Sequence, residues 1–332
     1  MECVRMIDLE CQTEDGVAAS WEGAARFLLG LNLREYAVMC PKCKDTGLPL
    51  TKWVKGPKTK PLCIVHRKMG DGLLTCSLDG RQAKQIRGTM SLSDGEIEVL
   101  LGSATPYILF SGGKDSLATL MYLNKLASKT STSLVALHVD TTVGFPETLS
   151  YVKDVCSALD VELQIVRPDT DYFTLANQWG IPAFNSRWCC RELKIKPIAE
   201  FLKTVPGSKI VFDGIRAAES SLRATYMPIW FHPGFRCLSV SPIFQWSDEE
   251  VYSRACVQGL PERPHLDLGS STECWCGAYK TRSDFEALHR LNPSLYDKLE
   301  QVEANNKFGF TFIYEKGERI SLQAIRTNLE AG

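Results

Sequence analysis

The chain has 332 residues, of which 44% are hydrophobic and 23% charged, so its composition is that of a globular protein and excludes a largely disordered chain. With 38 basic and 39 acidic side chains, its overall charge does not indicate a protein that binds nucleic acid or a membrane surface. No apolar run approaches the ~20 residues of a membrane span, and residues 1–10 lack the apolar segment of a signal peptide. We therefore expect a cytoplasmic protein without a membrane partner.

The first 90 residues are expected to hold two small modules. Residues 1–35 form a helical segment, because apolar residues recur with helical spacing between Trp21 and Leu33. Residues 36–90 form a zinc-ribbon-like module. Its four predicted Zn²⁺ ligands follow the paired spacing C-x2-C and C-x2-H, at Cys40, Cys43, Cys63 and His66.

Two features of this module leave alternatives open. Cys76 is an alternative ligand to His66, and unligated turn cysteines are the alternative to a metal site. Lysines surround Trp53 between the two ligand pairs. They suit contact with RNA or DNA through phosphates and stacking, or they form a solvated charged hairpin.

From Pro106 onward, short apolar segments alternate with helical ones. The expected strands are 107–110, 133–139, 161–166 and 209–212, and the expected helices between the first three are 117–129 and 147–159. This alternation predicts an α/β fold, an open parallel sheet with helices on both faces. We assign residues 91–265 to this domain, which is entered through a capped helix at 91–101.

The last segment, residues 266–332, is expected to hold a cysteine loop, a helix and a short C-terminal hairpin. The helix is predicted at 283–298. The hairpin is predicted from strands 310–314 and 319–322, which are separated by Glu315-Lys-Gly-Glu318.

A phosphate-binding loop is predicted between the first strand and the first helix of the α/β domain. Its sequence is Ser111-Gly112-Gly113-Lys114-Asp115-Ser116. Two glycines let the backbone approach a ligand closely, and the N–H groups at a helix start attract an anion. Lys114 adds a positive charge and the serines add donors. The Walker pattern G-x-x-x-x-G-K-S/T is absent, so this is not the loop of a P-loop NTPase; a glycine-rich turn that serves only packing is the alternative.

This hexapeptide resembles the PP-loop of the N-type ATP pyrophosphatase superfamily. Four further segments are similar to those of its phosphoadenosine phosphosulfate (PAPS) reductase-like branch. They are D-T-T-V-G-F-P-E-T from Asp140, C-C-R-E-L-K-I-K-P from Cys189, G-I-R-A-A-E-S-S-L-R-A from Gly214 and P-I-F-Q-W-S from Pro242. The resemblance covers about residues 105–277 and implies an adenine-nucleotide α-hydrolase-like fold.

The resemblance also implies where an adenine nucleotide binds, namely at the carboxyl ends of the strands. Residues 111–116 would hold the phosphates or the sulfate end of ATP, adenosine phosphosulfate (APS) or PAPS. His138 and Asp140 would lie near the nucleoside. Asp115 or Asp140 would hold Mg²⁺ if ATP is the substrate.

Three cations are expected next to the anion of the nucleotide: Lys194, Arg216 and Arg223. For each arginine, a solvated surface charge or a structural ion pair is the alternative. The candidate catalytic residues are Lys114, Asp115, Lys194 and Arg216.

Thirteen cysteines are an odd and high number, which favours metal ligation over the disulfide framework of a short secreted chain. Cys189 and Cys190 cannot both be routine core residues, because neighbours point in different directions. With Cys274 and Cys276 they make four thiolates, which suit a [4Fe–4S] cluster or Zn²⁺; thiols without metal are the alternative. APS reductases of the resembled family carry such a cluster on C-C…C-x-x-C, whereas the second half here is C-x-C. Cys237 or Cys256 is therefore an alternative fourth ligand.

The resemblance implies an enzyme of sulfur metabolism. Reductases of the family attack the sulfur of a sulfonucleotide with a cysteine near the C-terminus, and no cysteine follows Cys276 here. We therefore expect ATP-dependent, pyrophosphate-releasing activation coupled to iron–sulfur-assisted sulfur transfer, from an external sulfur donor to an acceptor such as RNA or DNA. One alternative is a sulfonucleotide reductase with an atypical thiol, such as Cys3 or Cys11, and an external electron donor. The other is a non-catalytic regulator that binds nucleotide or nucleic acid.

Overall fold

The computed structural model describes residues 91–331 apart from 184–185, 233, 256–258, 266–267, 269–271 and 316, and before them residues 27–28, 31, 38–39 and 47–48. The predicted zinc ligands Cys40, Cys43, Cys63 and His66 lie outside the described residues, and so do Cys3, Cys11, Cys76 and Cys256. Within the first 90 residues, Phe27 and Leu28 are helical, and β1 (Val38–Met39) pairs antiparallel with β2 (Gly47–Leu48). In the part of the chain that the structure describes, no helix has the length and apolar character of a membrane span.

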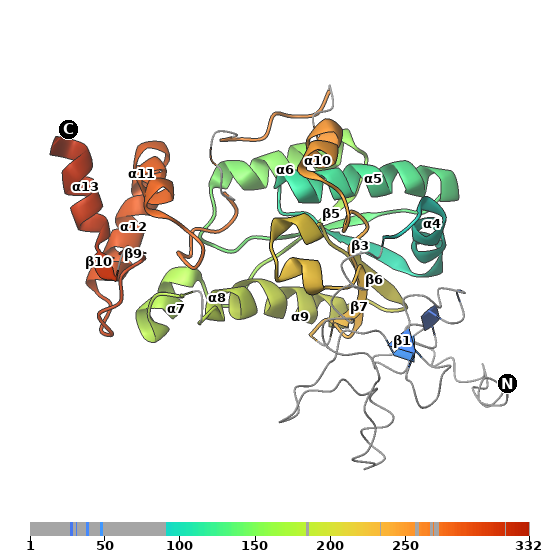
Figure 1. Ribbon diagram of the computed structural model, residues 1–332, viewed down its shortest axis with the longest axis horizontal. Coiled ribbons are helices and arrows are strands. Elements are labelled where there is room, and N and C mark those ends of the chain that lie inside the picture. The colour runs from blue at the N-terminus through green and yellow to red at the C-terminus, as the bar shows by residue number, and fades with distance from the viewer. Residues whose placement is uncertain are drawn as a thin grey trace, which may run out of the picture.

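A six-stranded, mostly parallel sheet forms the centre of the fold (Figure 1). Its strands, in spatial order, are β5 (Glu162–Val166), β4 (Val135–Val139), β3 (Thr105–Leu109), β6 (Lys209–Phe212), β8 (Cys237–Val240) and β7 (Ile229–His232). The four expected strands are all present and parallel. β7 and β8 were not expected. β7 runs antiparallel to β8, because the four residues between them allow a hairpin but not a crossover.

Helices cover both faces of this sheet, as the alternating pattern predicted. On one face lie α4 (Asp94–Ser103), α5 (Lys114–Thr130), α6 (Pro146–Ala158) and α10 (Asp248–Ala255), and on the other α7 (Tyr172–Trp179), α8 (Trp188–Cys190) and α9 (Lys196–Thr204) (Figure 1). A π-helical turn, Arg191–Ile195, joins α8 to α9. Ser93 caps α4 in a capping box with Glu96, in agreement with the expected capped start.

Burial on both faces explains why the central strands are almost wholly apolar. Ile108 and Phe110 belong to the core under α5, whereas Tyr107 belongs to the core under α9. The Tyr107 ring meets the Phe201 ring of α9 edge-on, with centroids 5.7 Å apart. All five residues of β4 are buried, so this strand is covered on both faces of the sheet.

The C-terminal segment forms α11 (Arg282–Leu291), α12 (Pro293–Ala304), the β9 (Ile313–Glu315) and β10 (Glu318–Ile320) hairpin, and α13 (Leu322–Ala331). The single helix expected at 283–298 was wrong. Asn292 caps a second helix by accepting from the N–H of Leu295 at 3.0 Å, and Pro293 has no N–H with which to continue the first. The hairpin is shorter than expected, and α13 was not expected. A second hydrophobic core joins α11, α12 and α13 to α7 and α8.

Candidate functional site

The predicted phosphate loop lies at the point where the strand order reverses. β4 and β6 flank β3 on opposite sides, so the chain leaves the carboxyl ends of β3 and β6 in opposite directions. Ligands of open α/β sheets bind at such a point. Residues 111–116 follow β3, and residues 213–216 follow β6. A Cβ at Gly214 would lie 3.0 Å from the carbonyl carbon of Asp115, so the two segments touch through their backbones and leave no room for a side chain there.

The loop itself is braced by local geometry. Gly112 has φ +81°, and a Cβ there would lie 3.3 Å from Thr148 Cγ2 and 3.2 Å from Val152 Cγ2. Ser116 Oγ donates to the carbonyl of Gly113 at 3.0 Å and lies 3.1 Å from Ser111 Oγ. Gly113 is the N-cap of α5 and provides no side-chain cap, so the first amides of α5 are left to a ligand or water.

The cations beside the loop are paired with carboxylates. Arg216 is only 2% exposed and donates through Nε to Asp115 Oδ1 at 2.6 Å and through Nη2 to Asp248 Oδ1 at 2.7 Å. Lys114 Nζ donates to the same Asp248 oxygen at 2.6 Å. Arg223 pairs instead with Glu219, four residues before it. Asp248 was not predicted as a site residue from the sequence, although it directly follows Trp246-Ser247.

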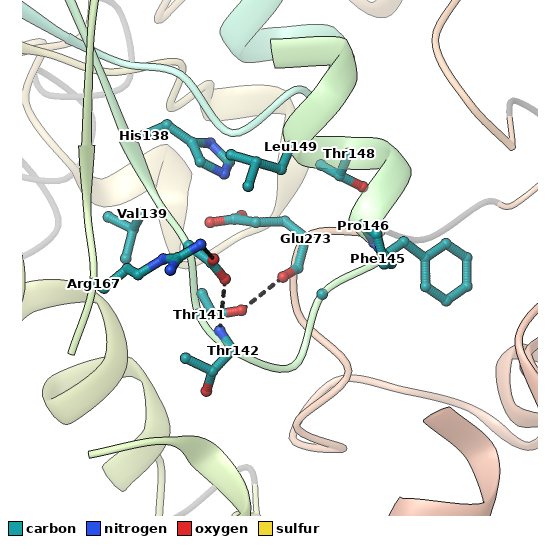
Figure 2. A pocket seen from close by; sticks show the side chains of 12 residues that line it. His138, Val139, Thr141, Thr142, Phe145, Pro146, Thr148, Leu149, Arg167 and Glu273 are labelled. Atoms are coloured by element: carbon teal, nitrogen blue, oxygen red, sulfur yellow. Dashed lines mark hydrogen bonds and ion pairs between the residues drawn. The ribbon is translucent and has the colours of Figure 1, made fainter. Parts of the chain in front are cut away.

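A cavity of about 390 Å³ opens at the carboxyl end of β4 (Figure 2). It is lined by His138, Val139, Asp140, Thr141, Thr142, Gly144, Phe145, Pro146, Thr148, Leu149, Arg167 and Glu273. His138 and Asp140 are therefore both in the wall of one cavity. His138 Nδ1 lies 2.8 Å from the carbonyl oxygen of Phe110, which can only accept, so Nδ1 carries the proton and a neutral ring offers Nε2 as an acceptor.

This cavity adjoins the phosphate loop. Phe110, the acceptor for His138, immediately precedes Ser111, and Thr148 lines the cavity while contacting the position of Gly112. Asp140 Oδ2 accepts from Arg167 Nη2 at 2.8 Å, so one carboxylate and one guanidinium face each other on the wall. The arrangement places the predicted phosphate loop next to a cavity large enough for a small ligand.

Four cysteine side chains from two distant segments meet beside the cavity. Cys189 and Cys190 lie on α8, and Cys274 and Cys276 on the segment before α11. Cys189 Sγ and Cys276 Sγ are 3.4 Å apart. Hydrogen bonds link Cys189 to Cys190 and Cys274 to Cys276 as well, so the four thiols form one chain of contacts, which we call the cysteine quartet.

The thiols of the cysteine quartet perturb one another. The hydrogen bond that Cys189 donates to Cys190, together with burial, raises the pKa of Cys189 to about 12. The same bond lowers the pKa of Cys190. Within the described residues, no three His, Cys, Asp or Glu side chains have the arrangement of a formed metal site. By chemistry, four thiols are a donor set that suits a [4Fe–4S] cluster or Zn²⁺, and two of the four sulfurs, those of Cys189 and Cys276, lie 3.4 Å apart. Cys237 is buried in β8 within a different core.

One ion pair connects the cysteine quartet to the cavity. Glu273, the residue before Cys274, points into the cavity near His138, as Figure 2 shows. Its Oε2 accepts from Lys194 Nζ at 3.0 Å, and Lys194 lies in the π-helical turn that follows Cys190. Burial lowers the pKa of Lys194, but the Glu273 carboxylate more than offsets this and leaves that pKa raised. Sequence reasoning missed Glu273, whose only signal was its position next to a cysteine.

The loop between β4 and α6 fixes the segment that carries Glu273. Thr141 Oγ1 donates to the carbonyl of Glu273 at 2.7 Å, and the Trp275 N–H donates to the carbonyl of Val143 at 2.8 Å. A Cβ at Gly144 would lie 2.5 Å from the carbonyl oxygen of Glu273, so only glycine permits this approach.

Residues 105–274, just over half of the chain, match the phosphoadenosine phosphosulfate reductase domain. The chain belongs to the phosphoadenosine phosphosulfate reductase family, which confirms the resemblance.

Its relatives include an uncharacterised protein of Methanocaldococcus jannaschii, 29% identical over 59% of this chain and 40% of that protein. The adenosine 5'-phosphosulfate reductase of Mycolicibacterium smegmatis is 28% identical over 54% of this chain and 75% of that enzyme. Among solved structures, the PAPS reductase of Candida auris in complex with phosphate aligns with 60% of this chain and 97% of its own, at TM-score 0.43 and 21% identity. The chain spans less than half the length of the first relative.

Proposed function

We propose that this protein binds ATP at the phosphate loop and the adjoining cavity, activates an acceptor by adenylylation, and transfers sulfur to it with the help of a [4Fe–4S] cluster held by the cysteine quartet. The observation that carries the proposal is the segment from Glu273 to Cys276. Glu273 of this segment lines the cavity, and Cys274 and Cys276 contribute two thiols to the cysteine quartet. A nucleotide in the cavity and a metal on the quartet would therefore be neighbours.

The residues divide this chemistry between them. The amides at the start of α5 and Lys114 would bind the triphosphate, and the cavity wall with His138 would take the nucleoside. Asp140 lines the cavity and offers oxygen ligands for the Mg²⁺ that accompanies ATP; Asp115, which accepts from Arg216, is the second candidate. Arg216 and Lys194 are the nearby cations that would balance the negative charge.

The proposed reaction has two balanced steps. An oxygen of the acceptor attacks the α-phosphorus of ATP, and pyrophosphate leaves. A sulfur donor at the oxidation level of sulfide then displaces AMP, which carries away the acceptor oxygen. When bound, the cluster supplies an iron site for the incoming sulfur if one of the four thiolates stays unligated. The acceptor class we infer is RNA or DNA, on the basis of the lysine-rich segment around Trp53.

The described thiols favour activation over reduction. Sulfonucleotide reduction needs a thiolate that attacks sulfur. Outside the quartet, the described cysteines are Cys156 and Cys237. Both are 1% exposed, and burial raises their pKa to about 11 and about 12. Neither is placed to act as a nucleophile, so a reductase would have to use a cysteine outside the described residues or one of the quartet.

The assay that tests the proposal compares pyrophosphate release and sulfite release by one anaerobic preparation of the full chain. Pyrophosphate release from ATP, increased by added RNA or DNA, supports activation. Sulfite release from APS or PAPS with a thiol reductant, without pyrophosphate release from ATP, would establish the reductase instead. Nucleotide affinity without either release would point to a regulator that has kept the fold without the chemistry.

A further inference from the structure

Asp248 connects Lys114 of the phosphate loop to Arg216. Its Oδ1 accepts from Lys114 Nζ at 2.6 Å and from Arg216 Nη2 at 2.7 Å, although its side chain is 66% exposed. These two cations lower the pKa of Asp248, so the carboxylate is ionised at neutral pH. An exposed carboxylate thus lies where the charges of Lys114 and Arg216 converge.

The position of this carboxylate is set by helix α10. Ser247 and Glu250 cap the helix, since the Ser247 N–H donates to Glu250 Oε2 at 2.7 Å and the Glu250 N–H donates to Ser247 Oγ at 3.1 Å. Asp248 is the first residue of α10, and Tyr252 lies one turn later on the same side. The Lys114 ammonium lies 4.7 Å from the centre of the Tyr252 ring, so both residues of α10 hold this lysine.

We propose that Asp248 is a carboxylate latch, which occupies Lys114 and Arg216 in the absence of nucleotide and is displaced by the nucleotide's phosphates. The proposal rests on the proposed function, because it assumes that the loop binds phosphates. A carboxylate oxygen and a phosphate oxygen compete for the same ammonium and guanidinium donors. Asp248 therefore lowers the affinity of the loop for any anion, and its release couples α10 to nucleotide binding.

The test is calorimetric titration of the full chain with inorganic pyrophosphate, which probes the loop, and with adenosine, which probes the cavity. Asp248→Asn removes the competing charge and keeps the shape of the side chain. We expect it to bind pyrophosphate about three- to tenfold more tightly than the wild type and to bind adenosine equally well. Glu249→Gln, an exposed neighbour on the same turn, removes the same unit charge away from the latch and is the matched control. Its affinity for pyrophosphate should change less than twofold.

A second variant tests the latch independently, and the remaining outcomes distinguish failure of the latch from failure of the proposed function. Tyr252→Leu removes the aromatic contact with Lys114 and should tighten pyrophosphate binding about twofold. Equal or weaker pyrophosphate binding by Asp248→Asn would overturn the latch and show that Asp248 positions Lys114 for the ligand, with nucleotide binding by the wild type intact. If neither the wild type nor Asp248→Asn binds pyrophosphate or ATP, the proposed function fails together with the latch.

Discussion

The ammonium group of Lys194 and the carboxylate of Glu273 lie 3.0 Å apart, although 79 residues separate them in the chain. Lys194 follows the two cysteines of α8, and Glu273 precedes Cys274. The ion pair therefore links the two halves of the cysteine quartet, and its carboxylate also forms part of the cavity wall. A substitution of Lys194 should therefore change the effect of a substitution of Glu273 on stability.

A double-mutant cycle should measure this link. We expect Lys194→Met and Glu273→Gln each to destabilise the fold, with a coupling energy of about 1–3 kcal/mol in urea unfolding, because each removes one half of an ion pair whose carboxylate is only 10% exposed. The control pair is Lys129 and Glu98, also 3.0 Å apart but more exposed, which should couple by less than about 1 kcal/mol. Equal coupling in the two cycles would contradict a special role for the first pair.

Loss of the loop cation should weaken nucleotide binding. Lys114→Ala removes a charge-assisted contact to phosphate, so we expect ATP affinity to fall about tenfold or more. Lys129→Ala, at the other end of the same helix, is the control and should leave affinity unchanged. The measurement is calorimetric titration with ATP and Mg²⁺. An unchanged affinity of Lys114→Ala would count against the assignment of the loop.

The backbone of the loop should tolerate no side chain at Gly112. Gly112→Ala puts a Cβ at φ +81° and within 3.2 Å of Val152, so we expect a loss of about 1–3 kcal/mol of stability as well as weaker ATP binding. Gly102→Ala in α4, where nothing lies within 4 Å of the new Cβ, should be neutral or stabilise by up to about 1 kcal/mol. Thermal unfolding of the two variants distinguishes these outcomes, and equal stability would show that the loop relaxes freely.

Metal content should depend on the cysteine quartet. We expect Cys190→Ser, purified without oxygen, to lose most of the iron that the wild type carries, because a hydroxyl is a poor ligand for iron–sulfur clusters. Cys156→Ala, in a separate core, should keep it. Elemental analysis and the absorbance spectrum are the measurements. Zinc in place of iron would select the alternative metal, and full metal content in Cys190→Ser would refute Cys190 as a ligand.

Stability should fall in mild acid because of His232. Burial lowers the pKa of this side chain to about 4, and its Nδ1 accepts from the Phe235 N–H at 3.1 Å, a bond that protonation breaks. The unfolded chain binds the proton near pH 6.5, so stability is complete above that pH and is lost as the pH falls towards 4, by about 2–3 kcal/mol. Urea unfolding between pH 7 and 4 should show this loss in the wild type. In His232→Gln, the loss of unfolding free energy between pH 7 and 4 should be smaller by about 2–3 kcal/mol. If the wild type and His232→Gln lose the same unfolding free energy over this range, His232 is not the cause.

The central strands could be predicted because their signal is local. The segments expected at 107–110 and 209–212 are short, largely apolar and bounded by turn residues, and they fall in β3 and β6 of the structure. β8 was missed because Ser239 interrupts the short apolar run of Cys237–Val240. Its place in the sheet comes from pairing with β6 and β7. The break at Pro293 was a local signal that outweighed the helical periodicity around it.

By itself, the sequence determined the family, the paired cysteines and the glycine-rich turn that we predict to bind phosphate, because each of these depends on residues that are adjacent in the chain. Only the tertiary structure decided that Asp248 lies on Lys114 and Arg216, that Glu273 faces the cavity, and that Cys189 meets Cys276. Lys114 and Asp248 are 134 residues apart, and Cys189 and Cys276 are 87 apart. The order of the strands and the packing of helices on both faces determine which distant segments meet, and no local pattern of residues encodes that order.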